Sequence, residues 1–453
     1  MGSSGLKPAP LYQQTNATTT DNRQPTTDNR QPTTDMKILL IHQNFLEPED
    51  GGGSRFNEMT RLWAEAGCEV TILAGMVHHA TGRKPGRYRG KYTYVHELSE
   101  RRRVIRCHVS AAYGRGFLGR LWGYFSFVFS ALYAGLFRAG GGYDLILATS
   151  PPLFVGITAR LLSLLKRTPM VFEVRDLWPE SAIDTGVLNN KLAIRLAYAL
   201  EAHLYRKAVL VAVLTPAFRQ TLVEQKGVSP DKILLLPNAA DFSLAEQTAE
   251  GFDVAAFRQK MGWEGKLVLL YVGAHGVANR LMQLIDAAEL LQDRPEVLFV
   301  LVGDGMRKPA LQDAVKERGL KNVQFIPIVP KSEVFKYILA ADYGMSVLKK
   351  CDTFKTIYSN KTFDYMSCRK PVLLLIDGVS RQLVVEQAQC GHYVEPENPA
   401  LLAQSIRDVL LKERSEERRK MGESGYRYAK EHFDRRLLAA KYLEALKGVV
   451  GRE

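Results

Sequence analysis

The sequence has few of the features that mark secreted, metal-binding or nucleic-acid-binding proteins. Its five cysteines show no CxxC or other metal-ligand spacing, so we expect reduced thiols in a cytoplasmic protein. Residues 1–35 contain no apolar segment of the signal-peptide type. The nine histidines are scattered, and the basic residues form no recognisable nucleic-acid-reading motif. We therefore expect no metal site and no nucleic-acid partner.

Residues 1–35 are polar and contain the heptapeptide TTDNRQP twice in succession, at Thr19–Pro25 and Thr26–Pro32. MGSSG at the start is typical of an added leader. Such a segment buries too little apolar surface to order itself, so we predict disorder up to a natural start near Met36. The alternative is a short functional repeat.

The remaining length is too great for one ordinary core. The 453 residues, with 46% hydrophobic and 24% charged residues, predict two soluble domains of roughly 150–200 residues each. The net charge of +13 lies in the body of the chain, because three cations offset three carboxylates in residues 1–35: Lys7, Arg23 and Arg30 against Asp21, Asp28 and Asp35. This excess suggests an anionic partner, such as a phosphorylated substrate, acidic lipid or nucleic acid.

The first half alternates apolar runs with amphipathic segments. KILLIH after Met36, the glycines 51–53, a helix over 55–66 and a strand over 68–73 predict a β–glycine-loop–α–β unit, the start of a Rossmann-like domain. The alternation continues to a strand at 233–236, and residues 237–241 read as a linker.

Residues 83–137 interrupt this alternation. Leu121–Phe137 carries no charge and is rich in aromatic residues. We favour a helix lying on an anionic membrane surface; a core helix beside a solvated basic loop and a borderline spanning helix are the alternatives. Eleven cations precede this helix, against two glutamates: Arg83, Lys84, Arg87, Arg89, Lys91, Arg101, Arg102, Arg103, Arg106, Arg115 and Arg120.

The second half repeats the plan, with strands predicted at 267–272 and 297–302, each followed by a glycine-containing loop, and a final helix at 437–450. Open parallel sheets bind ligands at the carboxyl ends of their strands. Near the end of this domain, Ser359 and Asn360 are good helix-capping residues. Lys361 and Asp364 would share one face of the helix that follows, which suits a ligand with phosphate and sugar hydroxyls. A surface ion pair is the alternative.

The order of motifs resembles the GT-B glycosyltransferases of family 4, which are retaining and metal-independent. The similarity extends from Met36 to the C-terminus, and the branch that the chain resembles is that of the bacterial O-antigen and capsule enzymes related to the N-acetyl-fucosamine transferases. It rests on six motifs: KILLIHQNF with GGGSR, FEVRDLWPES (172–181), LLPNAAD (235–241), YVGAHG (271–276), LVGDG (301–305) and SNKTFDYM (359–366).

The resemblance implies an α/β chain of two Rossmann-like domains facing a central cleft. Residues 36–237 would form the acceptor domain, residues 238–430 the nucleotide-sugar domain, and residues 431–453 a C-terminal helix returning to the first domain. It also implies a set of donor-binding residues. Lys361 and Arg280 would bind the diphosphate, Asp364 the ribose, and Ile328 and Val329 the base. Other expected contacts are Gly52, Gly53, Arg55, Gly273, His275, Gly276, Gly303, Asp304 and Gly305.

Two positions depart from the family pattern. In the E-x7-E motif, Asp364 replaces the second glutamate and Thr356 stands at the place of the first. The sugar hydroxyls would then be bound by the backbone N–H groups of Thr356, Ile357, Tyr358 and Ser359, or by other side chains. A family histidine after strand 171–174 is replaced by Arg175-Asp176, which leaves Asp176 and Glu180 as candidates for acceptor activation or for plain capping and surface charge.

The expected reaction is transfer of a sugar from a nucleotide-diphosphate donor, of the UDP-HexNAc type, to a polyprenyl-diphosphate-linked or other glycan acceptor, with retention and no cofactor. The expected location is the inner face of a bacterial cell membrane. Two alternatives remain open: a GT-B sugar-nucleotide epimerase and a non-catalytic sugar-nucleotide-binding protein.

Overall fold

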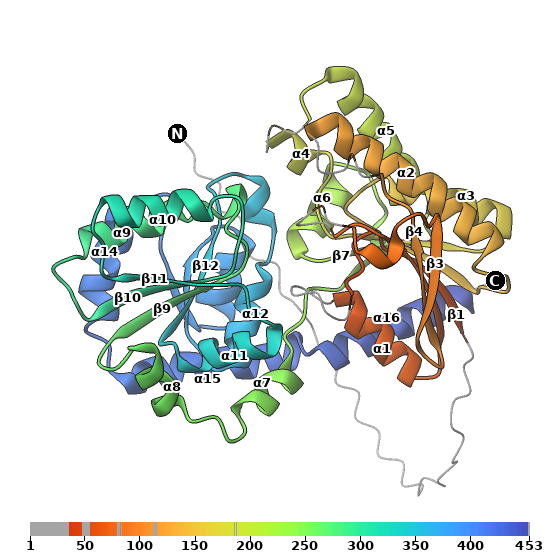
Figure 1. The fold of residues 1–453 in the computed structure, drawn as a ribbon. Coiled ribbons are helices and arrows are strands. Elements are labelled where there is room, and N and C mark those ends of the chain that lie inside the picture. The colour runs from red at the N-terminus through yellow and green to blue at the C-terminus, as the bar shows by residue number, and fades with distance from the viewer. Residues whose placement is uncertain are drawn as a thin grey trace, which may run out of the picture. The chain divides into compact units, whose positions relative to one another are not determined.

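The computed structural model describes residues 36–47, 55–78, 82, 84–110, 112, 116–184, 186 and 188–451, without the side chains of 116–118 and 120. The described chain contains two sheets, of eight and of six strands (Figure 1). Residues 35–453 form one compact unit. Gly52 and Gly53 lie outside the described residues, so their predicted role stays a prediction.

The first sheet has the order β3-β4-β2-β1-β5-β6-β7-β8, and its pairs are parallel except for β3 with β4. Helices cover both faces of the central strands, which explains their continuous apolar runs. The strands are β1 (Lys37–Ile41), β2 (Glu69–Gly75), β3 (Thr93–Ser99), β4 (Arg102–Cys107), β5 (Leu145–Ser150), β6 (Met170–Val174), β7 (Leu210–Val213) and β8 (Ile233–Leu235).

The basic segment 83–120 differs from the sequence-based expectation, because β3 and β4 form a hairpin within it. Several of its arginines therefore serve the fold and not a solvated surface. Arg103 donates to the carbonyl of Ala139 and to Thr71 Oγ1 at 3.1 Å. Arg106 is buried and pairs with Glu47 at 3.1 Å.

Helices α2, α3, α5 and α6 pack on one face of the first sheet, and α1 and α16 pack on the other. Alternate residues of β1 point to the two sides: Leu39 and Ile41 to the first group of helices, Ile38 and Leu40 to the second. The helices of this half are α1 (Arg55–Glu65), α2 (Gly116–Phe137), α3 (Val155–Lys166), α4 (Glu180–Asp184), α5 (Lys191–Lys207) and α6 (Pro216–Glu224).

The second sheet is parallel throughout, in the order β11-β10-β9-β12-β13-β14. Its strands are β9 (Leu267–Val272), β10 (Val297–Val302), β11 (Val323–Ile326), β12 (Tyr343–Val347), β13 (Val372–Leu375) and β14 (Gly391–Tyr393). Its principal helices are α7 (Phe242–Ala249), α8 (Val254–Met261), α9 (Met282–Leu290), α10 (Lys308–Glu317), α11 (Lys331–Ala340), α12 (Asn360–Ser367), α14 (Pro399–Ser405) and α15 (Ser415–His432).

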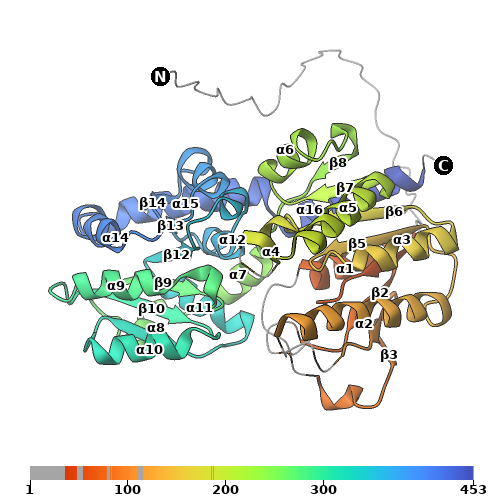
Figure 2. The same cartoon turned by 90° about the horizontal axis from the view of Figure 1, so that it is seen from above.

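Helix α16 (Arg435–Val450) leaves the second sheet and packs beside α1 (Figures 1 and 2). Trp63 of α1 donates its indole N–H to the carbonyl of Ala439 at 3.0 Å, and its ring meets the Tyr442 ring edge-on. Where the chain leaves the second sheet, Ala240 N donates to Phe433 O at 2.9 Å. The C-terminal helix is thus part of the first domain's core.

We expect Leu446→Ala to lower the free energy of unfolding by about 3 kcal/mol, because it opens a cavity between α16 and the first sheet. Leu446 is fully buried, whereas Leu437 on the same helix is 51% exposed. Leu437→Ala is the matched control and should change stability by less than about 0.5 kcal/mol. Urea titration of both variants measures the difference; equal losses would contradict the packing of α16.

Candidate functional site

The loops after β9 and β10 pack against each other, backbone to backbone. A Cβ on Gly303 would lie 2.0 Å from the carbonyl oxygen of Gly273, and one on Gly305 would lie 2.6 Å from that of His275. His275 N donates to Asp304 O at 2.8 Å. We expected Gly303 and Gly305 to allow close approach of a ligand; in the structure they first allow close approach of the neighbouring loop.

The His275 side chain is fully buried between the Tyr271 and Phe325 rings. Neither ring nitrogen has a hydrogen-bond partner among the described residues. Burial, together with the charge of Lys308, lowers the pKa of His275 to about 4. The imidazole is therefore neutral at physiological pH, and it packs the loop from within.

Two lysines contact these loops: Lys308 Nζ donates to the carbonyl of Gly303 at 2.8 Å, and the Lys361 side chain lies against the loop after β9. Lys361 Nζ lies 5.0 Å from the centre of the Tyr271 ring, and a Cβ on Gly273 would lie 3.3 Å from Lys361 Cε. Its Nζ also donates to Ser359 Oγ at 3.4 Å. Burial lowers the pKa of Lys361 to about 8, although the Asp364 charge opposes this shift. A largely protonated, poorly solvated ammonium at the start of α12 is well placed to bind an anion.

Asp364 follows on the same helix, but no ion pair joins its carboxylate to Lys361 within the described structure. Burial raises the pKa of the Asp364 carboxyl, and the charges of Lys331 and Arg435 act in the opposite direction. The simple surface ion pair is therefore not what the structure contains. Both side chains are partly buried, and they do not pair with each other.

Arg280 lines a cavity of about 430 Å³ between α9 and α10, which is the size of a small-ligand site. Gly276, Arg307 and Glu397 line the same cavity. Arg280 and Glu397 form an ion pair at 3.4 Å, and both have left-handed backbone conformations, with φ of 47° and 60°. Non-glycine residues held in this conformation cluster at functional sites. Sequence patterns gave no signal for Glu397.

The segment before α12 is largely committed to packing. Thr356 O accepts a hydrogen bond from Thr215 Oγ1 at 2.6 Å, and Ile357 O accepts one from Ser380 Oγ at 2.8 Å. Tyr358 packs on the Phe363 and Phe433 rings. Ser359 precedes α12 but its side chain makes no capping hydrogen bond, contrary to expectation.

The expected base-binding residues lie at the end of β11. Ile328 is exposed and Val329 is partly buried against the core of this domain. Asp304 is exposed too, and its carboxylate accepts a hydrogen bond from Gly305 N at 2.7 Å. Ligand contact by all three stays a prediction.

Arg55 has a structural role that the sequence did not indicate. Its guanidinium pairs with the fully buried Glu173 of β6 at 3.1 Å. It also donates to the carbonyls of Leu236 and Pro237, at 3.0 and 2.7 Å. The buried side chain and these partners give Arg55 a role in the fold, and its contact with a diphosphate or acceptor stays a prediction.

Asp176 and Glu180 lie near each other at the start of α4. Burial raises the pKa of Asp176 to about 6, although a hydrogen bond from Ser181 Oγ at 2.8 Å lowers it. Glu180 pairs with Lys226 Nζ at 2.7 Å, and Lys226 also pairs with Glu201 at 2.6 Å. Asp176 thus has the proton affinity of an acid–base group, whereas Glu180 belongs to an ion-pair cluster.

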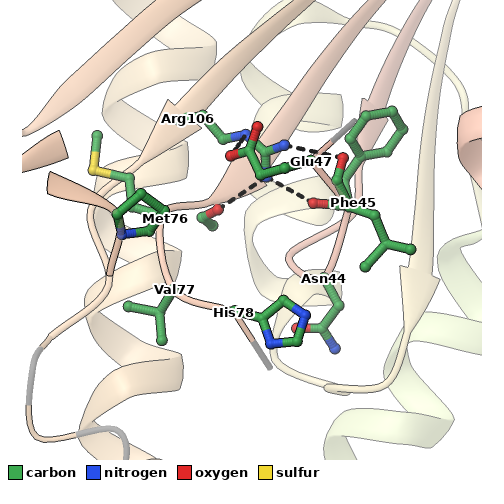
Figure 3. A pocket seen from close by; sticks show the side chains of 10 residues that line it. Asn44, Phe45, Glu47, Met76, Val77, His78 and Arg106 are labelled. Atoms are coloured by element: carbon green, nitrogen blue, oxygen red, sulfur yellow. Dashed lines mark hydrogen bonds and ion pairs between the residues drawn. The ribbon is translucent and has the colours of Figure 1, made fainter. Parts of the chain in front are cut away.

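A smaller pocket lies at the carboxyl ends of β1 and β2 (Figure 3). Its charged members are Glu47 and Arg106, and Arg106 Nη1 donates to Phe45 O at 2.7 Å. Its volume of about 30 Å³ is that of roughly one water molecule. Sequence patterns missed this pair. The pocket is too small for a sugar, and its arginine is held by the protein itself.

Two family matches together span most of the chain. Residues 50–239 match the glycosyl transferase 4-like domain, and residues 253–428 match the glycosyl transferases group 1 family. The chain is a GT4-type glycosyltransferase of the GT-B fold. This glycosyltransferase is 25% identical over 383 residues to a protein named as the colanic acid biosynthesis glycosyl transferase WcaI of Escherichia coli (strain K12). The match covers 83% of this chain and 92% of that protein.

Solved structures share the fold of this glycosyltransferase. Sucrose-phosphate synthase from Thermosynechococcus elongatus superposes with a TM-score of 0.70 at 18% identity, over 92% of this chain and all 100% of that one. Anabaena HepE in complex with UDP superposes with a TM-score of 0.66 at 18% identity, over 91% and 100% of the two chains. These likenesses confirm two Rossmann-like domains, whose sheets are parallel except for the pair of β3 and β4.

No group of three or more histidine, cysteine, aspartate or glutamate side chains among the described residues is arranged to hold a metal ion. The expectation that this glycosyltransferase needs neither metal nor cofactor stays a prediction.

We expect Arg55→Met to lower the free energy of unfolding by about 3 kcal/mol, because it leaves the Glu173 carboxylate buried without its partner. Adding Glu173→Gln should restore part of this loss, since an amide is cheaper to bury than a carboxylate. Urea titration of both variants measures the effect. If Arg55→Met were as stable as the wild type but failed to bind UDP, Arg55 would be a ligand residue after all.

Proposed function

We propose that this enzyme transfers a sugar from a UDP-sugar of the HexNAc type to a lipid-linked glycan acceptor, with retention of configuration and without a metal. The observation that carries the donor half is the Lys361 ammonium at the start of α12, against the glycine loop after β9. The name of WcaI supports a role in surface polysaccharide biosynthesis, of which O-antigen synthesis by an N-acetyl-fucosamine transferase would be one case. The UDP complex of HepE supports a uridine donor.

The chemistry of the proposal is leaving-group stabilisation. As the glycosidic bond breaks, negative charge grows on the diphosphate, and cations or helix N-termini aimed at it lower the barrier. Lys361 would supply one such charge. Arg280, more than half exposed and paired only weakly with Glu397 at 3.4 Å, would exchange that carboxylate for phosphate oxygens.

The other assignments in the proposal come from the resemblance to the family. Asp364 would accept the ribose hydroxyls, and Ile328 and Val329 would lie against the base. Asp176 is our candidate for acceptor activation, because its raised pKa suits proton transfer near neutral pH. The remaining partners in the proposal are a lipid-linked acceptor and an anionic membrane surface on the cytoplasmic side.

Lys361→Met should reduce transfer from UDP-sugars by at least roughly 100-fold, as expected when one group that stabilises developing charge is removed. Lys336→Met, at a partly exposed lysine of α11 that pairs with Glu333, is the matched control and should transfer normally. Release of UDP with a lipid-linked acceptor measures the rate, and NMR of the product gives the anomeric configuration. Wild-type turnover by a folded Lys361→Met variant would refute the role of this lysine. An epimerised donor formed without any acceptor would favour the isomerase.

The affinity for UDP should fall as the pH rises through 8. The free Lys361 has a pKa of about 8, and a bound diphosphate would raise it, so binding takes up a proton above this pH. We expect the association constant to fall by up to roughly tenfold per pH unit from about pH 8 upward. Titration calorimetry measures it, and Lys361→Met should remove this dependence. A flat profile in the wild type would contradict a diphosphate at Lys361.

A further inference from the structure

Helix α2 presents aromatic side chains outward as well as inward. Phe127, Ala131 and Ala134 pack in the core of the first domain. On the opposite side, four aromatic residues spaced seven, four and four apart form one stripe: Trp122 (57% exposed), Phe129 (58%), Tyr133 (42%) and Phe137 (71%). A helix that only covers a sheet would have polar residues on this side.

The neighbouring helix continues the same surface. Helices α2 and α3 lie side by side (Figures 1 and 2), and a Cβ on Gly135 would lie 2.4 Å from Leu162 Cδ1. Three leucines of α3 face outward beside the stripe: Leu161, Leu164 and Leu165. We call these seven exposed side chains the α2–α3 face. Contiguous exposed apolar surface of this kind marks an interaction site.

The segment that carries this face is strongly basic. Residues 101–172 contain a single carboxylate, Asp144, whose Oδ2 accepts a hydrogen bond from Lys37 N at 2.8 Å. Arg138 follows the stripe, Arg160 lies on α3, and Arg167 ends α3. The surface therefore complements a partner that is anionic and apolar at once. A second copy fits poorly, because apposing two such faces would bring like charges together.

We propose that the α2–α3 face lies flat on an anionic lipid bilayer, with its aromatic rings at the boundary between headgroups and acyl chains. Tryptophan, tyrosine and phenylalanine prefer this depth, and flanking arginines meet the phosphates. No described helix is long and apolar enough to cross a membrane. The surface differs from the basic segment expected from the sequence, because Arg103 and Arg106 are engaged in the fold and α3 supplies three of the seven exposed side chains.

The α2–α3 face would be the membrane contact of the proposed function. The membrane proposal rests on that function only for the reason why the protein would bind a membrane. Vesicle binding is measured without donor or acceptor, and UDP binding is measured without vesicles. If the protein binds UDP but no vesicles, only the membrane proposal is wrong. If it binds vesicles but no UDP, only the proposed function is wrong.

The test uses the whole protein with vesicles of phosphatidylcholine mixed with phosphatidylglycerol, and with phosphatidylcholine alone. Trp122 is the exposed tryptophan of the chain; Trp63 and Trp263 are buried and Trp178 is partly buried. Its fluorescence should shift to the blue on the anionic vesicles and be quenched by lipids brominated in the acyl chain. Trp122→Phe should still bind the vesicles, without this spectral change.

Two further variants separate the apolar and the electrostatic contributions. Trp122→Ser combined with Phe129→Ser and Phe137→Ser should bind anionic vesicles at least roughly tenfold more weakly. The control replaces exposed residues away from the face, Leu290→Ser with Val409→Ser and Leu437→Ser, and should bind as the wild type does. Arg138→Gln with Arg160→Gln should lower the preference for phosphatidylglycerol.

Equal vesicle binding by the triple serine variant, or binding without any change in Trp122 emission, would overturn the proposal. So would a dimer in sedimentation velocity that the triple variant loses, in a protein that binds no vesicles, because the face would then join two copies.

Discussion

The contact between the loops after β9 and β10 is the constraint on which the candidate donor site depends. Gly303 and Gly273 approach more closely than any side chain would permit, since a single Cβ would meet a carbonyl oxygen at 2.0 Å. This contact fixes the backbone of Gly273, and Lys361 rests against that backbone. The lysine is desolvated there without a carboxylate partner of its own, which is why its pKa falls to about 8. The packing of these two loops thus affects the protonation of Lys361, and with it the positive charge that a ligand would meet.

The two halves of the chain use their polar groups differently at the carboxyl ends of their strands. In the first half, Arg55 and Arg106 are tied by Glu173, Glu47 and backbone carbonyls, so these charges hold the fold together. In the second half, Lys361 and Arg280 have weak or long contacts, and Arg280 is more than half exposed. A buried ion pair is costly to break, whereas an exposed pair at 3.4 Å exchanges readily. These contacts therefore favour the second half of the chain as the part that would bind the sugar donor.

Much of the fold could be predicted because buried parallel strands read as continuous apolar runs, as in Leu267–Val272. The hairpin of β3 and β4 could not, because β4 carries three arginines, and the partners of Arg103 and Arg106 are distant in the sequence. Lys361 was found through its helix-start signature, but Glu397 has no local pattern, and its meeting with Arg280 depends on tertiary structure. The seventeen uncharged residues of α2 were ambiguous, because one side packs in the core and the other is exposed.

The return of α16 has a consequence for how the protein is made. Residues 435–450 are synthesised after the whole second domain, yet Leu438, Tyr442 and Leu446 belong to the core of the first. Domains generally fold in order during translation, from the N-terminal side onward. Here the first domain must wait, with Trp63 and the neighbouring side chains of α1 uncovered, until its final helix leaves the ribosome. The domain made first is completed last.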